Sequence, residues 1–112
     1  MENDEIMQIY YSFIEILEEL SMPPQEQIKK LQGTVVADEL ATDFSDIGLA
    51  YAEILKENHW INQEQFHIAE EINNMLDKMS EDTNLWDEKA LLYSKEWDYC
   101  RQNGKELLDT LS

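Results

Sequence analysis

The chain has 112 residues, of which 25 are Asp or Glu and only 8 are Lys or Arg, so its formal net charge is −17. Such a charge excludes DNA, RNA and anionic membrane surfaces as direct partners, because these polyanions would repel it. It favours a basic protein partner, although a charge of this sign can also serve solubility alone.

A chain of this length is typical of one domain, which we expect to cover residues 1–112. Its hydrophobic content of 43% is too high for a disordered protein. The single cysteine cannot form an internal disulfide, and the acidic start Met1–Glu5 is unlike a signal peptide. No apolar run reaches the roughly 20 residues of a membrane span. We therefore expect a cytoplasmic protein.

The N-terminal part of the sequence predicts two helices separated by prolines. Hydrophobic residues recur at helical spacing over about 4–20, at Ile6, Tyr10, Phe13, Ile14, Leu17 and Leu20. Pro23 and Pro24 end this helix, since proline lacks the amide donor. Pro24 can also serve as the first residue of a short second helix that reaches about Leu31.

A long third helix is predicted over about 35–58. Its hydrophobic stripe consists of Val36, Leu40, Phe44, Ile47, Tyr51 and Ile54. A stripe of five carboxylates lies immediately beside it and consists of Glu39, Asp43, Asp46, Glu53 and Glu57. Gly48 lies in the middle of this helix, where it costs about 0.5–1 kcal/mol relative to Ala. It therefore indicates either a close helix crossing or a local break.

The C-terminal half predicts one short and two long helices. Asn62 is the expected N-cap of a helix that ends near Met79, with Gln65 as its capping-box partner. A short helix over about 87–92 and a last helix over about 95–111 follow, the latter capped by Ser94. The sum is an all-α fold, an antiparallel bundle of about four main helices with one or two short connecting helices.

Residues typical of catalysis are few. Glu64 and His67 have the Glu-x-x-His spacing of di-iron bundles, but the second copy that such a site needs is missing. Cys100 lies in a strongly negative chain, which disfavours the thiolate that a nucleophile requires. We therefore predict a protein that is not an enzyme and holds no metal or cofactor. A metal-binding protein built around Glu64 and His67 is the least favoured alternative.

The carboxylates are the candidate binding surface. A rigid acidic helix face can oppose a lysine-rich cleft and accelerate association. Besides the stripe on the third helix, a second acidic patch is predicted at Asp77, Glu81, Asp82, Asp87 and Glu88. Trp60 and Trp86 flank loops and are candidate anchors, since tryptophan is favoured at interface hot spots.

A family resemblance is carried by three segments of the sequence: Glu39–Phe44, Ile72–Ser80, and Leu85–Leu91 followed by Glu96 and Trp97. They resemble small acidic helical proteins of bacteria, including immunity proteins against polymorphic or contact-delivered toxins. The resemblance implies an immunity protein or antitoxin that binds and occludes a basic toxin domain, such as a nuclease. The alternative is a non-enzymatic interaction module, either a homodimer or an adaptor, whose charge serves solubility.

Overall fold

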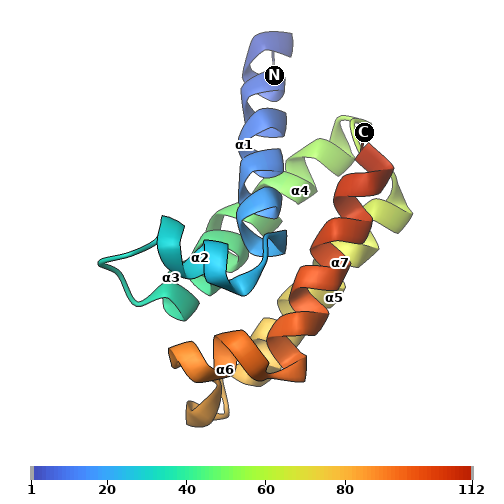
Figure 1. The fold of residues 1–112 in the computed structure, drawn as a ribbon. Coiled ribbons are helices and arrows are strands. Elements are labelled where there is room, and N and C mark those ends of the chain that lie inside the picture. Colours follow the sequence, from blue (N-terminus) through green and yellow to red (C-terminus); the bar gives the residue numbers. More distant parts are fainter. Residues whose placement is uncertain (1, 112) are drawn as a thin grey trace.

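Helices form nearly all of the computed structural model, which describes residues 2–111 (Figure 1), and the predicted all-α class is confirmed. No strand occurs within these residues. The elements are α1 (Asn3–Ser21), α2 (Pro24–Lys30), α3 (Val36–Thr42), the π-helical turn η1 (Asp43–Gly48), α4 (Leu49–Glu57), α5 (Gln63–Met79), the 3-10 turn η2 (Thr83–Leu85), α6 (Glu88–Tyr93) and α7 (Lys95–Leu111).

The long helices pack as antiparallel neighbours. α7 runs beside α5 and also packs against α1, while α4 packs on both α1 and α5 (Figure 1). Gly104 lies where α7 meets the end of α1, and a Cβ atom at this position would collide with the hydroxyl of Ser21. The glycine therefore permits the close helix approach.

A continuous hydrophobic core joins these helices. Its largest members are fully buried, namely Phe13, Leu17, Phe44, Leu55, Ile72, Trp97 and Leu107. The indole of Trp97 donates a hydrogen bond to the carbonyl of Leu85 at 2.7 Å. Its ring lies 5.6 Å from that of Trp86 in an edge-to-face arrangement, which is favourable for aromatic pairs. These contacts attach the 3-10 turn and α6 to the last helix.

The predicted third helix is continuous from Val36 to Glu57, but its hydrophobic stripe is correct only as far as Phe44. The wide turn η1 adds one residue to the helical repeat, which rotates everything after it by about 100°. The fully buried residues after the turn are consequently Gly48, Ala52 and Leu55, while Tyr51 and Ile54 are only partly buried and Tyr51 packs at the edge of the core. Ile47 is 42% exposed as a result.

Gly48 shows why the π turn occurs at this point. A Cβ atom on Gly48 would lie 3.3 Å from both Ile16 Cγ2 and Phe44 Cδ2, tighter than ordinary contact. α1 thus crosses η1 at the glycine, so the close crossing is the explanation that applies, and the helix widens into a π turn there without breaking. The register shift places the smallest residue of the helix under α1.

Helix ends follow the local chemistry. The capping box predicted for α5 is confirmed, because Asn62 and Gln65 exchange two hydrogen bonds of 2.8 Å. Ser94 caps α7 by accepting a hydrogen bond from the amide of Trp97 at 3.2 Å. α4 ends in a Schellman-type motif, in which the amide of Trp60 bonds to the carbonyl of Leu55. His59 occupies the left-handed position of this motif with φ 64°, where glycine is usual.

A buried polar bridge connects α1, α2 and α7. The side-chain amide of Gln27 donates to the carbonyls of Leu20 at 2.8 Å and Glu19 at 3.1 Å, near the end of α1. Its oxygen accepts a hydrogen bond from Arg101 Nη1 at 3.1 Å. The bridge satisfies helix-terminal carbonyls that would otherwise be unpaired inside the protein. Within residues 2–111, no helix is long and apolar enough to cross a membrane.

Candidate acidic interface

The carboxylate stripe predicted on the third helix is divided by the π turn. Asp46, Glu53 and Glu57 are exposed, whereas Glu39 and Asp43 are partly buried. Asp43 lies at the start of η1, where this turn packs against α1. The stripe therefore has an exposed part on η1 and α4 and an inner part that approaches α1.

Asp43 and Glu19 form a pair of carboxyl groups across the contact between η1 and α1. Partial burial raises the pKa of Asp43 most, and the charges of Glu19 and Glu39 together with a side-chain hydrogen bond to Glu19 raise it further. Lys30 Nζ lies 3.2 Å from Glu19 Oε2. Because the chain has 25 Asp and Glu but only 8 Lys and Arg, most carboxylates cannot each have a basic side chain as a partner.

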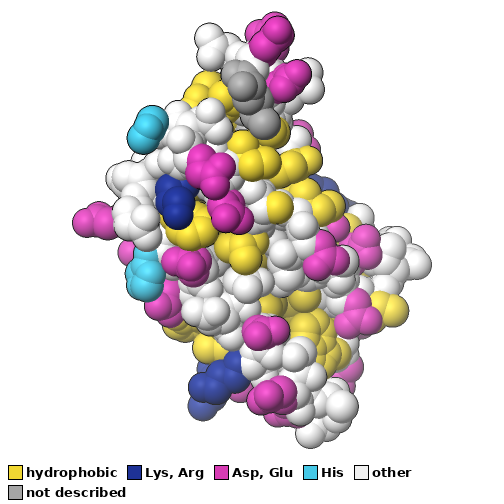
Figure 2. Space-filling model, turned by 180° about the vertical axis from the view of Figure 1, so that it is seen from behind, with side chains coloured by type: hydrophobic (Ala, Val, Ile, Leu, Met, Phe, Trp, Pro, Cys, Tyr) yellow, Lys and Arg dark blue, Asp and Glu magenta, His cyan; other side chains and the backbone are white. Residues whose placement is uncertain are grey.

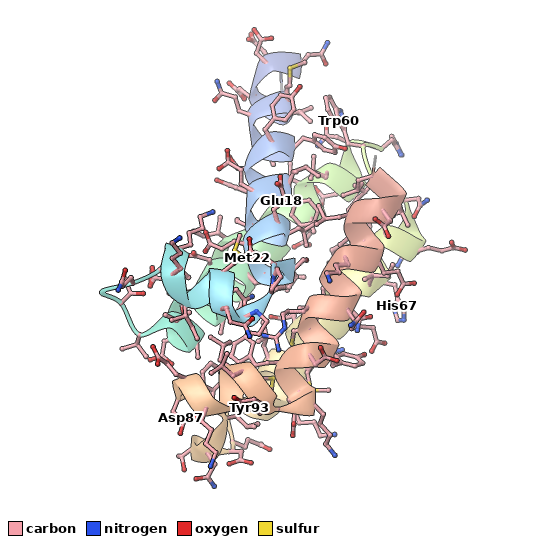
Figure 3. The ribbon with its side chains drawn as sticks, viewed as in Figure 1. Glu18, Met22, Trp60, His67, Asp87 and Tyr93 are labelled. Atoms are coloured by element: carbon pink, nitrogen blue, oxygen red, sulfur yellow. The ribbon has the colours of Figure 1, made fainter. Side chains whose placement is uncertain are left out.

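A groove of about 360 Å³ runs past this carboxyl pair. It is lined by Glu15, Ile16, Glu18, Glu19, Met22, Lys30, Asp43 and Ile47, and we call it the acidic groove. Glu18 lies on the C-terminal half of α1, and Met22 directly follows the end of this helix (Figure 3). Carboxylates beside apolar side chains suit a long cationic side chain, whose hydrocarbon stem needs apolar contacts and whose head needs a negative partner.

The carboxylates that α1 contributes to this groove were not selected from the sequence. Glu15 and Glu18 are exposed on α1, and Glu19 is partly buried. A signal was present, because Glu18 and Glu19 follow Glu15 by three and four positions and no Lys or Arg occurs before Lys29. The sequence does not show that these glutamates lie near Asp43, because that proximity depends on how α1 crosses η1.

The second predicted patch lies at the end of the molecule where α6 packs against α3, and its five carboxylates are exposed. Asp87 and Tyr93 mark this end, opposite Trp60 (Figure 3). Two of the patch residues cap helices: Asp82 accepts from the amide of Asn84 at 2.9 Å, and Asp87 accepts from the amide of Ala90 at 2.7 Å. The remaining carboxylates of the patch are Asp77, Glu81 and Glu88.

The two candidate tryptophan anchors differ in their surroundings. Trp86 is partly buried, donates to the carbonyl of Met79 at 3.0 Å and packs on Trp97. These contacts give it a structural role. Trp60 is 36% exposed, and its ring lies 5.5 Å from the ring of Tyr10. Trp60 therefore has the surface available for a partner.

Negative charge is not confined to either patch. Figure 2 shows Asp and Glu side chains across one whole face of the molecule, with hydrophobic side chains between them and far fewer Lys and Arg. The electrostatic potential around the protein is consequently negative in many directions. The acidic groove differs from the rest of this surface because its carboxylates line a concave site.

His67 has its carboxylate contacts with Glu70 and Glu71, which follow it on α5. His67 Nε2 is 3.2 Å from Glu71 Oε1 on the surface of α5, and within residues 2–111 no three potential ligand groups cluster. Cys100 is fully buried, and this burial raises the pKa of its thiol to about 12. The folded protein therefore holds this thiol in its neutral, unreactive form.

No family model, curated protein or solved structure matches this chain.

Proposed function

We propose that this protein binds a basic protein through its acidic groove and the neighbouring carboxylates of η1 and α4. Its most specific form is an immunity protein or antitoxin that occludes a basic toxin domain, such as a nuclease. A nuclease must be basic where it holds phosphates, so an acidic protein that covers this surface excludes the nucleic acid.

The observation that supports this proposal is the carboxyl pair of Asp43 and Glu19. Like charges that share a partly buried site oppose folding, and here a single lysine compensates them. A lysine or arginine from a partner would relieve the repulsion on binding. The closeness of Asp43 and Glu19 therefore destabilises the protein alone and favours its complex with a partner that supplies a lysine or arginine.

The surrounding charges would act mainly on the rate of association. Asp46, Glu53 and Glu57 are exposed next to the groove, and exposed rim charges steer encounter more than they hold the complex. Two copies of this chain, each with a charge of −17, would repel one another. The charge therefore favours a basic partner over the alternative of a homodimer.

The test uses a basic toxin nuclease domain, to be sought among the genes that neighbour this one, and measures association by stopped-flow fluorescence. One variant combines Glu18→Gln and Asp46→Asn, and its control combines Glu64→Gln and Glu106→Gln, which removes the same two charges from exposed positions on α5 and α7. We expect the first variant to associate about tenfold more slowly than the control at low salt. Equal rates would remove the acidic groove from the interface.

A further inference from the structure

Three aromatic residues and one methionine, of which all but Tyr10 are exposed, lie on the N-terminal half of α1 and on the connection between α4 and α5. Met7 is 41%, Tyr11 59% and Trp60 36% exposed. The ring of Tyr10 lies 6.0 Å from that of Tyr11 and 5.5 Å from that of Trp60. We call these four residues the aromatic patch. Trp60 lies beside the N-terminal half of α1 (Figure 3).

Two hydrogen bonds hold Tyr10 and Trp60 of the aromatic patch in place. The hydroxyl of Tyr10 donates to the carbonyl of Leu111 at 3.2 Å, at the end of α7. The backbone of Trp60 is fixed by the motif that ends α4, through its hydrogen bond to Leu55 at 2.8 Å. Side chains ordered before binding lose little entropy when a partner arrives, which is the usual advantage of rigid aromatic contact surfaces.

Carboxylates border the aromatic patch along the same helix. Asp4 and Glu15 are three and four residues from Met7 and Tyr11 respectively, and Glu18 lies one turn further. No Lys or Arg precedes Lys29 in the chain. A ligand for this surface must therefore offer apolar side chains to the rings and positive charge to the carboxylates, and a second copy of α1 offers only negative charge.

We propose that the aromatic patch docks an amphipathic cationic segment of the partner protein, with apolar residues flanked by Lys or Arg. This inference rests on the proposed binding of a basic partner and adds a second, apolar contact to it. Rings of Tyr and Trp take apolar side chains and also attract ammonium and guanidinium groups over their faces. The charged residues of the segment reach Asp4, Glu15 and Glu18, which continue toward the acidic groove.

A synthetic helical peptide with leucines on one face and lysines on the other is the probe. Its binding to the ¹⁵N-labelled protein is followed by NMR at about 150 mM salt, where long-range charge effects are screened. We expect shifts concentrated on Met7, Tyr11 and the Trp60 indole. Tyr11→Ser should weaken binding about tenfold, as truncation of an interface aromatic commonly does. Tyr93→Ser is the matched control, because Tyr93 is 80% exposed on α6 at the other end.

Two further peptides separate this inference from the proposed function. A peptide with the same lysines but serines in place of leucines should bind at least about tenfold more weakly. If it binds equally well, or if Tyr11→Ser and Tyr93→Ser behave alike, the aromatic patch is not the docking site while binding of basic partners stands. If neither lysine peptide binds, both proposals fail. Equal binding of a leucine–glutamate peptide would contradict the cationic character of the segment.

Discussion

Ser21 and Gly104 form the closest approach between α1 and α7, and a double-mutant cycle on this pair tests how the fold depends on it. Ser21 is 3% exposed, and its hydroxyl has no hydrogen-bond partner among residues 2–111. A Cβ atom on Gly104 would collide with this hydroxyl and lie 3.4 Å from the Cβ of Ser21. The hydroxyl, and not the backbone, is therefore the obstacle to a side chain at position 104.

The two substitutions should act in opposite directions when made singly. Ser21→Ala removes a buried unpaired hydroxyl and should stabilise the protein by about 1 kcal/mol. Gly104→Ala gains about 1 kcal/mol of helix propensity. The same substitution overpacks the crossing, at a cost of about 1–3 kcal/mol. In the Ser21→Ala background the collision is absent, so Gly104→Ala should become stabilising by about 1 kcal/mol.

Urea denaturation of the four proteins, followed by circular dichroism, gives the free energies of unfolding. The coupling between the two sites should be about 1–3 kcal/mol, because it reports the collision alone. If Gly104→Ala changes stability equally in both backgrounds, the reasoning is refuted, since the serine hydroxyl would then not limit the approach of the helices.

Four further predictions concern single residues. Asp43→Asn should raise the thermal midpoint at neutral pH. Because the folded pKa of Asp43 lies above its ordinary value, its ionisation lowers stability as pH rises through that pKa, so the benefit of the variant should shrink toward pH 3 and an unchanged benefit would contradict this account. Cys100, with a pKa of about 12, should resist thiol reagents near pH 8 until urea unfolds the chain; rapid labelling of the folded protein would disprove its burial. His59→Gly should stabilise the protein by about 1 kcal/mol in chemical denaturation, because glycine adopts positive φ without strain, and a loss of stability would exclude this reason. Trp97→Ala should destabilise it by about 3–5 kcal/mol, and an unchanged melting midpoint would show that the indole is not part of the core.

The boundaries of most helices were predictable because their determinants are local. Pro23 and Pro24 separate α1 from α2, the capping box of Asn62 and Gln65 begins α5, and Ser94 caps α7. Each of these signals acts over a few residues, through one missing donor or one side-chain hydrogen bond. A single sequence contains everything needed to recognise them.

The π turn was not predictable from periodicity. Ile47 is three residues and Gly48 four residues after Phe44. Both spacings are typical of one helix face, so either residue could share the buried face with Phe44. Only the crossing of α1, with Ile16 above the glycine, selects the second possibility. The hydrophobic stripe and the carboxylate stripe of this helix were therefore both displaced after Phe44.

Some properties of the candidate site follow from the sequence, and others follow only from the tertiary structure. Composition alone determined that the chain is strongly acidic and helical, because charge and helix propensity are properties of residues and of short segments. Tertiary structure decided which carboxylates meet, bringing Glu19 of α1 to Asp43 of η1, and which tryptophan stays available, with Trp86 against Trp97 and Trp60 beside Tyr10. Contacts between residues distant in the chain depend on how helices cross, and helix crossings are fixed by packing of the whole core.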